Sequence, residues 1–383
     1  MTTLLVTNDF PPTVGGIQSY LRDYADEYVS RAGDGDLIVF ASTQDTAASE
    51  AWDRGVGYEV IRWPRRVMLP TPAVRREMQR IIRERGIDTV WFGAAAPLAV
   101  LGGAAKRAGA SRVVATTHGH EVGWSMVPGA RGVLRRIGRS ADVVTYISRY
   151  TLRRFGRAFG PGPQFVALPS GVDTEFFRPV STGRRREVRA RLGVGDAPLV
   201  VCASRLVARK GQDQLIRALP QLRSLVDGTR LLLIGAGAYE PTLRKLAGEL
   251  GPEAEGAVIF AGGVTREELR DAVAAADVFA MPARTRGWGL DVEGLGIVYL
   301  EAQACGVPVL AGDSGGAPET VTSETGVVMD GRDTEAIAAE LAGLLADPGR
   351  RTRMGEEGRR FVEKHFAWQE LGDRIFRVLR PLG

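Results

Sequence analysis

Short runs of aliphatic and β-branched residues alternate with helical patterns along this chain, and no other feature restricts its fold as strongly. Such alternation is typical of parallel β-sheets whose crossover connections are helices. The runs form two sets, within residues 4–168 and 199–329, and only helical patterns follow, over 337–345, 350–364 and 369–379. The sequence therefore predicts an α/β protein with two parallel sheets in two domains, which a length of 383 residues also favours.

The expected strands can be placed from these runs. Those of the first sheet are Leu4–Thr7, Leu37–Ala41, Tyr58–Ile61, Thr89–Phe92, Val113–Thr117, Val143–Tyr146 and Phe165–Leu168. Those of the second sheet are Leu199–Ala203, Leu231–Ile234, Val258–Phe260, Val278–Met281, Val309–Ala311 and Val327–Met329. Between the sheets, Pro179 and Gly183 mark a link over 173–183, so we expect domains at 1–178 and 179–367.

Composition indicates where the protein resides and what kind of partner it has, but not which reaction it performs. A hydrophobic content of 44% and a charged content of 25% are those of a soluble globular protein. No segment is a good membrane span or secretory signal, and the two cysteines offer no disulfide framework, so we expect a cytoplasmic protein. A net charge of +5 indicates an anionic partner: a phosphate-bearing small molecule, a membrane surface or nucleic acid. Nucleic acid is the least favoured, because basic residues are not interleaved with exposed aromatics along a strand.

The stretch from Leu290 to Gly306 combines a glycine-broken loop with a short helix and carries two acids. Gly294 and Gly296 allow the backbone to approach a ligand closely, and a helix that starts near Ile297 would direct the N–H groups of Ile297 and Val298 at an anion. Glu293 would lie at the start of the helix and Glu301 inside it. An ordinary surface turn followed by an amphipathic helix explains the same pattern.

A basic loop follows the first strand of the second sheet. Arg205 and Lys210 bracket it, and Gly211 marks the bend before a helix that starts at Gln212. Ligands of open α/β sheets bind beyond the carboxyl ends of the strands, where these two cations could hold a diphosphate. A solvated basic loop is the alternative.

Other strand ends carry glycines. Gly16 opens a helix and could approach a phosphate, and the turn at Gly262 and Gly263 before Val264 could place backbone groups around a base, although simple turns explain both. After Gly235-Ala-Gly237 the third glycine of a dinucleotide fingerprint is missing, because Glu240 stands in its place. That substitution argues against a dehydrogenase.

Two histidines follow a strand of the first sheet, in His118-Gly-His120-Glu121. His118 could hydrogen-bond a sugar hydroxyl, or it could be structural. A metal site would need further ligands, and His365 is the only histidine left, so we expect no metal.

The region from Arg62 to Arg85 is strongly basic. It contains Arg62, Arg65, Arg66, Arg75, Arg76, Arg80, Arg83 and Arg85, with Met78, Ile81 and Ile82 on the apolar side of a helix. Such a helix could lie on an anionic membrane, or it could be an outer helix of the sheet with a solvated basic side.

Arg205 with Lys210, followed by Glu293 and Glu301, resembles the constellation of the retaining glycosyltransferases of the GT4 family, which have the GT-B architecture of two facing Rossmann-like domains. The likeness covers nearly the whole chain and is closest to the actinobacterial phosphatidylinositol mannoside mannosyltransferases of the PimB type. The segments that carry it are Thr7–Pro12, Gly15–Leu21, Trp91–Pro97, His118–Met126, Arg284–Arg286 and Asp291–Val298.

The resemblance implies transfer of mannose from GDP-mannose to the inositol 6-position of phosphatidylinositol monomannoside, with retention, in the biosynthesis of phosphatidylinositol mannosides, lipomannan and lipoarabinomannan. It implies no required cofactor or metal, and peripheral attachment to the inner face of the plasma membrane through the Arg62–Arg85 region. It also implies that the last helix, 368–383, returns to the first domain. Another acceptor or nucleotide-sugar, or a non-catalytic basic binding module, remains as an alternative.

By position, the resemblance assigns a role to each candidate residue. Arg205 and Lys210 would hold the diphosphate, and the backbone near Val264 would hold guanine. Glu293 and the N–H groups after Gly294 would bind the donor mannose, and Glu301 the ribose. His118 would face the mannose, and Gly16 would line the phosphate end.

Overall fold

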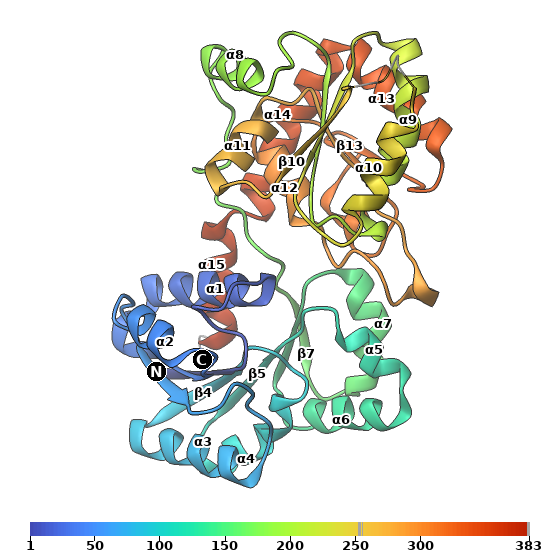
Figure 1. Ribbon diagram of the computed structural model, residues 1–383. Coiled ribbons are helices and arrows are strands. Elements are labelled where there is room, and N and C mark those ends of the chain that lie inside the picture. Colours follow the sequence, from blue (N-terminus) through green and yellow to red (C-terminus); the bar gives the residue numbers. More distant parts are fainter. Residues whose placement is uncertain (252–253, 255, 381–383) are drawn as a thin grey trace. The chain divides into compact units, whose positions relative to one another are not determined.

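The chain folds into two compact units, each with its own parallel sheet and its own core (Figure 1). A computed structural model describes residues 1–251, 254 and 256–380. Unit 1 comprises residues 1–170 and 368–383, and unit 2 comprises residues 171–367. The predicted α/β class with two parallel sheets is confirmed. Residues 381–383 of the predicted last helix lie outside the described residues.

Unit 1 contains a seven-stranded sheet in the order β3-β2-β1-β4-β5-β6-β7. The strands are β1 (Thr2–Thr7), β2 (Leu37–Ser42), β3 (Glu59–Trp63), β4 (Ile87–Phe92), β5 (Arg112–Thr116), β6 (Val143–Tyr146) and β7 (Gln164–Ala167). Because side chains alternate along a strand, Leu4 and Val6 enter the core on one face of the sheet and Leu5 enters the core on the other. All seven predicted strands are present, with ends that differ by at most two residues.

Helices cover both faces of this sheet (Figure 1). On one face lie α1 (Gly16–Ala32), α2 (Thr46–Asp53) and α15 (Trp368–Leu379). On the other lie α3 (Pro72–Arg85), the short η2 (Leu98–Leu101), α4 (Gly102–Ala108), α5 (Glu121–Met126), α6 (Pro128–Gly138) and α7 (Arg149–Phe159).

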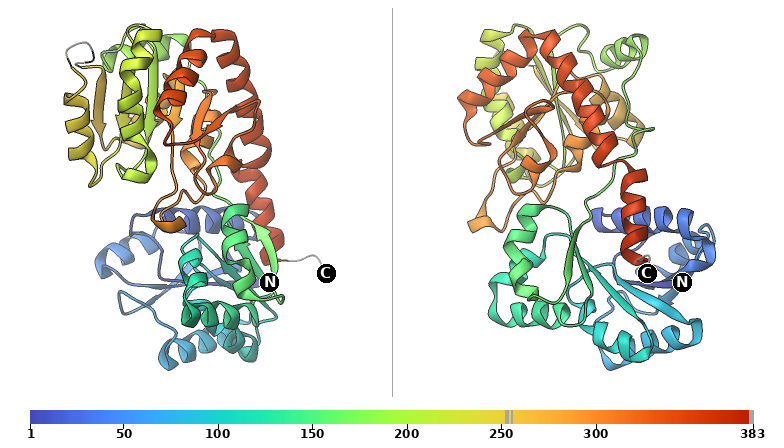
Figure 2. Two further views of the ribbon diagram at one scale, coloured as in Figure 1. Left: turned by 90° about the vertical axis from the view of Figure 1, so that its right-hand side faces the viewer. Right: turned by 180° about the vertical axis from the view of Figure 1, so that it is seen from behind.

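The last helix, α15, belongs to unit 1 and packs along α1 (Figure 2). The ring of Trp368 meets Tyr24 edge-on, with centroids 4.9 Å apart, and Arg31 Nε lies 2.6 Å from Asp373 Oδ1. The buried tyrosines of α1 thus form the surface to which the end of the chain returns.

Unit 2 contains a six-stranded sheet in the order β10-β9-β8-β11-β12-β13, and all six predicted strands are present. The strands are β8 (Leu199–Ala203), β9 (Arg230–Ile234), β10 (Val258–Gly262), β11 (Val278–Met281), β12 (Val309–Gly312) and β13 (Gly326–Met329). One face carries α9 (Gln212–Leu225), α10 (Glu240–Gly248) and α13 (Thr334–Ala346), and the other carries α8 (Thr182–Arg191), α11 (Arg266–Ala274), α12 (Ile297–Ala304) and α14 (Pro348–His365).

The chain enters unit 2 at Gly171, before the segment 173–183 that the sequence marks as a link. The Val172 N–H donates to the Phe366 carbonyl over 2.8 Å, and Phe177 is buried in the core of unit 2. Apolar residues on both sides of Asp173 thus attach the start of this segment to unit 2. No helix among the described residues is long and apolar enough to cross a membrane.

Candidate active site

The candidate residues of unit 2 gather where the strand order of its sheet reverses. β8 and β11 are neighbours, and the connections after them lead to opposite sides of the sheet. In open α/β sheets, this switch point is where ligands bind. The loop after β8 carries Arg205 and Lys210, and the loop after β11 leads to Glu293 and α12.

The two loops are packed tightly against each other at Gly211. Its φ is 80°, and a Cβ there would lie 2.1 Å from the Pro282 carbonyl oxygen, so only glycine fits. Arg205, earlier in the loop, is exposed, and its guanidinium has no side-chain or backbone acceptor among the described residues. Lys210 is buried instead, and its Nζ lies 2.6 Å from Oε2 of Glu293.

Several buried polar atoms around this pair have no hydrogen-bond partner among the residues that the structure describes. They are Glu293 Oε2, Arg209 Nε and Gln212 Oε1. Lys210 Nζ is close enough to Glu293 for an ion pair but is not aligned for a hydrogen bond, and Arg209 Nε lies 3.9 Å from the same oxygen. Buried polar groups without partners are rare in proteins. Their concentration here indicates a place where a polar ligand binds.

The start of α12 faces the same loops with unpaired donors. Gly296 caps the helix in a left-handed conformation, with φ 88°, and no side chain caps the helix. Within the described part of the chain, the N–H groups of residues 294–298 have no acceptor. The loop itself is fixed, because the Glu293 N–H donates to Ser314 Oγ over 3.1 Å and the Gly316 N–H donates to the Glu293 carbonyl over 2.8 Å. A rigid loop with free donors at a helix N-terminus suits an anion.

Glu301 lies one turn further into α12. Burial raises the pKa of its carboxyl to about 7, and the nearby charge of Arg266 only partly opposes this shift. Near neutral pH the carboxyl can therefore donate or accept a hydrogen bond, which suits a ligand hydroxyl.

Val264 follows β10 and leaves backbone groups free. Its side chain packs against the core of unit 2, while the N–H and C=O groups of Gly263 and Val264 have no partner among the residues described. Gly235 has a structural role instead: a Cβ there would lie 2.1 Å from the Ser204 carbonyl oxygen. The free backbone near Val264 can hydrogen-bond the edge of a planar base.

In unit 1, His118 follows β5 and lies beside Tyr20, with ring centroids 5.0 Å apart. Its Nε2 lies 2.7 Å from the Gly93 carbonyl oxygen, which can only accept, so Nε2 carries the proton and Nδ1 is an acceptor. Burial lowers the pKa of His118 to about 4, and the ring is neutral at pH 7.

Gly16 is the first residue of α1 and is exposed. A Cβ at Gly16 would meet no atom within 4 Å, so the space above it is open. Like His118, Gly16 lies at the carboxyl edge of the unit 1 sheet.

The carboxylate of Glu121 braces the His118 loop. Its Oε2 accepts hydrogen bonds from the N–H groups of His118 and Gly119, each over 3.1 Å, and its Oε1 lies 3.2 Å from His120 Nε2. Across the described residues, no group of three or more His, Cys, Asp or Glu side chains is placed to hold a metal ion.

Sequence reasoning missed three contributors in unit 2. Arg209 is next to Lys210 in the sequence, so it could have been predicted as a further cation of the same loop. The other two, Asp213 and Arg284, form a buried pair at 2.9 and 2.8 Å that ties the first turn of α9 to the loop after β11. Seventy-one residues separate the two, and no local pattern joins them.

The Arg62–Arg85 region divides into paired and free arginines. Arg62 is paired with Asp53 at 2.6 Å, Arg80 with Glu77 at 2.6 Å and Arg85 with Glu59 at 2.7 Å. Met78, Ile81 and Ile82 are buried, so α3 is an outer helix whose apolar side faces the core. Five exposed arginines of this region have no side-chain ion pair with a described residue: Arg65, Arg66, Arg75, Arg76 and Arg83.

Two Rossmann-like units, one with a cationic loop beside the N-terminus of a helix, are the arrangement expected of a GT-B glycosyltransferase. The family model "Glycosyltransferase Family 4" matches residues 14–176, and the model "Glycosyl transferases group 1" matches residues 184–361. The chain is also 55% identical, over 99% of its length and 97% of the relative's, to the "GDP-mannose-dependent monoacylated alpha-(1-6)-phosphatidylinositol monomannoside mannosyltransferase" of Corynebacterium glutamicum. The chain belongs to glycosyltransferase family 4, as its sequence motifs predict.

A second relative is equally similar. The "GDP-mannose-dependent alpha-(1-6)-phosphatidylinositol monomannoside mannosyltransferase" of Mycolicibacterium smegmatis is 55% identical over 98% of this chain and 97% of its own. Among solved structures, Anabaena HepE in complex with UDP matches all of both chains with a TM-score of 0.81 at 21% identity. The predicted GT-B fold is confirmed.

Proposed function

We propose that this protein is a retaining α-mannosyltransferase that moves mannose from GDP-mannose to the inositol 6-position of phosphatidylinositol monomannoside, which gives the dimannoside. The observation that carries the proposal is 55% identity, over 99% of the chain, to an enzyme named for this donor and acceptor. The candidate site of unit 2 supports it independently, because its free donors suit a diphosphate.

In this proposal, unit 2 holds the donor. Arg205 and the N–H groups of residues 294–298 bind the diphosphate, and Lys210 joins them by exchanging its contact with Glu293 for one with a phosphate oxygen. Glu293, released from Lys210, accepts hydrogen bonds from hydroxyl groups of the mannose. Glu301 binds the ribose, and the backbone at Val264 binds guanine. The proposal has His118 Nδ1 accept a hydrogen bond from a mannose hydroxyl. It places Gly16 beside the phosphate groups of the donor.

The chemistry follows from these charges. Negative charge grows on the leaving diphosphate in the transition state, and the two cations and the helix N-terminus stabilise it. The acceptor hydroxyl attacks the anomeric carbon on the face from which GDP leaves, and a donor phosphate oxygen takes its proton. The configuration is therefore retained without a carboxylate nucleophile, and no metal is required.

Incubation with GDP-mannose and phosphatidylinositol monomannoside, followed by mass spectrometry, tests the proposal. We expect one added hexose on the lipid, and selective thermal protection of the protein by GDP over UDP and ADP. If the lipid gains no hexose, the proposed acceptor is wrong, and if the three nucleotides protect the protein equally, the proposed donor is wrong.

We also propose peripheral attachment of the enzyme to the inner face of the plasma membrane, through unit 1. Unit 1 carries 25 Lys and Arg residues against 17 Asp and Glu, whereas unit 2 carries 25 against 28. The excess positive charge of the protein thus resides in the unit that contains the Arg62–Arg85 region. An anionic membrane attracts such a surface, by about 1 kcal/mol for each basic residue near it.

A further inference from the structure

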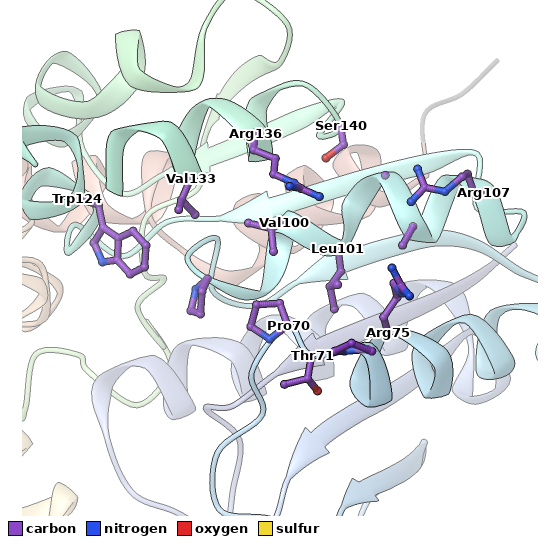
Figure 3. Close-up of a pocket in the computed structure, with 14 residues that line it drawn as sticks. Pro70, Thr71, Arg75, Val100, Leu101, Arg107, Trp124, Val133, Arg136 and Ser140 are labelled. Carbon is purple, nitrogen blue, oxygen red and sulfur yellow. The ribbon is translucent and has the colours of Figure 1, made fainter. Parts of the chain in front are cut away.

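Unit 1 has a groove on its outer helical layer, and Arg75 of the Arg62–Arg85 region is one of the residues that line it (Figure 3). It lies between α3, the η2–α4 segment and α6, and has a volume of about 550 Å³. This volume is within the range of small-ligand sites. All residues that line the groove belong to unit 1.

The groove has an apolar end and a basic end (Figure 3). Trp124 and Val133 lie toward one end, and Pro70, Val100 and Leu101 line the middle. At the other end, three arginines from three different helices surround the opening. They are Arg75 of α3, Arg107 of α4 and Arg136 of α6.

These three arginines have no carboxylate partner in the described part of the chain, although ion pairs occur beside them. Lys106, next to Arg107, lies 2.7 Å from Asp142, and Arg80, further along α3, is paired with Glu77. Like charges repel when they are brought together around one opening. An anion between the three guanidinium groups would relieve that repulsion, and bidentate hydrogen bonds would hold it.

Two loops that adjoin lining residues of the groove expose large apolar side chains. Val67 and Leu69 precede Pro70, and Met126 and Val127 follow Trp124 closely in the chain. All four are more than half exposed to solvent. Clusters of exposed apolar residues mark surfaces that bind other apolar matter. Exposed apolar side chains therefore adjoin, in the chain, the lining residues Pro70 and Trp124.

We propose that this groove holds one anionic glycerophospholipid, with its phosphate between Arg75, Arg107 and Arg136 and an acyl chain along Val100, Leu101 and Val133 toward Trp124. The loop tips then lie in the bilayer into which the rest of the lipid extends. The lipid anchors the enzyme and is distinct from the acceptor. This inference rests on the proposed membrane attachment and gives it a specific lipid contact.

Each helix of the groove supplies a matched control, because a neighbouring cation does not line the groove. The variant Arg75→Glu/Arg136→Glu removes two arginines of the groove, and Arg76→Glu/Arg135→Glu removes their sequence neighbours. Both variants lower the net charge from +5 to +1. A third variant, Val133→Trp, fills the channel without a change in charge.

The probe is dihexanoyl phosphatidylglycerol below its critical micelle concentration, titrated by isothermal calorimetry. We expect saturable binding of one molecule, weakened about tenfold or more by Arg75→Glu/Arg136→Glu and by Val133→Trp, and retained in Arg76→Glu/Arg135→Glu. Glycerol phosphate and dihexanoyl phosphatidylcholine, which lack the chains and the net charge respectively, should bind more weakly. Retained thermal protection by GDP serves as the folding control for each variant.

Three results would overturn the inference: equal losses in the two double variants, glycerol phosphate binding as tightly as the lipid, or no saturable binding at all. Sedimentation with phosphatidylglycerol vesicles tests membrane attachment separately. If the protein binds vesicles but not the lipid monomer, the groove is not a lipid site, although the proposed membrane attachment stands. If it binds neither, both proposals are wrong.

Discussion

At the scale of single residues, the ion pair between Lys210 and Glu293 links the stability of the protein to its proposed donor site. Both side chains are buried, and Glu293 Oε2 has no hydrogen bond to any described residue. Removing one member of a buried pair usually destabilises a protein, because the other charge is left unpaired. A loss of activity at Lys210 must therefore be separated from a loss of stability.

We expect Lys210→Ala to lower kcat by about 100- to 1000-fold, because it removes one charge that stabilises the leaving diphosphate. The double variant Lys210→Ala/Glu293→Gln should regain part of the thermal stability that the single variant loses, since no carboxylate then remains unpaired, but it should not regain turnover. Near-normal turnover of Lys210→Ala would remove Lys210 from the diphosphate site. Lys245→Ala, on the surface of α10, is the control and should match the wild type.

Glu301 predicts a pH dependence of stability. Its pKa of about 7 in the folded protein exceeds the ordinary value of 4.5, so the folded state binds this proton more tightly than the unfolded state. The cost of ionising Glu301 therefore grows from about pH 4.5 to pH 7 and is fully present above pH 7. Glu301→Gln should raise the free energy of unfolding of the ligand-free protein at pH 8 by about 1 to 3 kcal/mol, and change it little at pH 4.5.

Urea unfolding at the two pH values measures this difference, and titration with GDP measures the accompanying function. If Glu301 binds the ribose, the more stable variant should bind GDP more weakly. A variant that gains stability at both pH values alike would contradict the buried carboxyl, and unchanged GDP affinity would contradict the ribose contact.

At the scale of elements, the start of α12 depends on a single glycine. Gly296 has φ 88°, and a Cβ there would lie 2.5 Å from the Tyr299 ring. The Tyr299 hydroxyl donates to the Met281 carbonyl in the core over 2.5 Å, so the ring cannot easily move. We expect Gly296→Ala to destabilise the protein by about 1 to 3 kcal/mol and to weaken GDP binding.

Gly343, inside α13, is the matched control for this substitution. It is exposed, and a Cβ there would have only ordinary contacts, the nearest at 3.9 Å. Gly343→Ala should stabilise the protein by about 0.5 to 1 kcal/mol, because alanine favours a helix interior. Thermal unfolding compares the two variants, and a gain of stability in Gly296→Ala as well as in Gly343→Ala would show that the left-handed cap is not required.

The elements were predictable from sequence to the extent that their signals are local. Strands such as Leu199–Ala203 are continuous apolar runs between turn signals, and Gly296 before Ile297 marks the start of α12, so both were located within two residues. The contact between Lys210 and Glu293 was not predicted, because each was assigned to a different part of the donor and 83 positions separate them. The burial of the apolar side of α3 likewise depends on the sheet beneath it.

At the scale of the whole molecule, charge is distributed unevenly between two units that have separate cores. The cores share no residues, and unit 1 holds the positive excess while unit 2 is slightly acidic. The net charge of +5 is thus the sum of a basic unit 1 and a slightly acidic unit 2. Long-range attraction to an anionic membrane acts on the local surface and decays within a Debye length, so the distribution matters more than the sum.

We therefore expect binding to phosphatidylglycerol vesicles to depend on where charge is removed. Arg65→Glu/Arg66→Glu/Arg83→Glu in unit 1 and Arg186→Glu/Arg217→Glu/Arg353→Glu in unit 2 both change exposed arginines, and both lower the net charge from +5 to −1. Cosedimentation at low salt should show a loss of about 100-fold or more for the unit 1 variant and a small loss for the unit 2 variant, since each basic residue near the surface contributes about 1 kcal/mol. Added salt should weaken wild-type binding and reduce the difference between the variants. Equal losses in both would mean that net charge alone drives association, and unit 1 would then have no special role at the membrane.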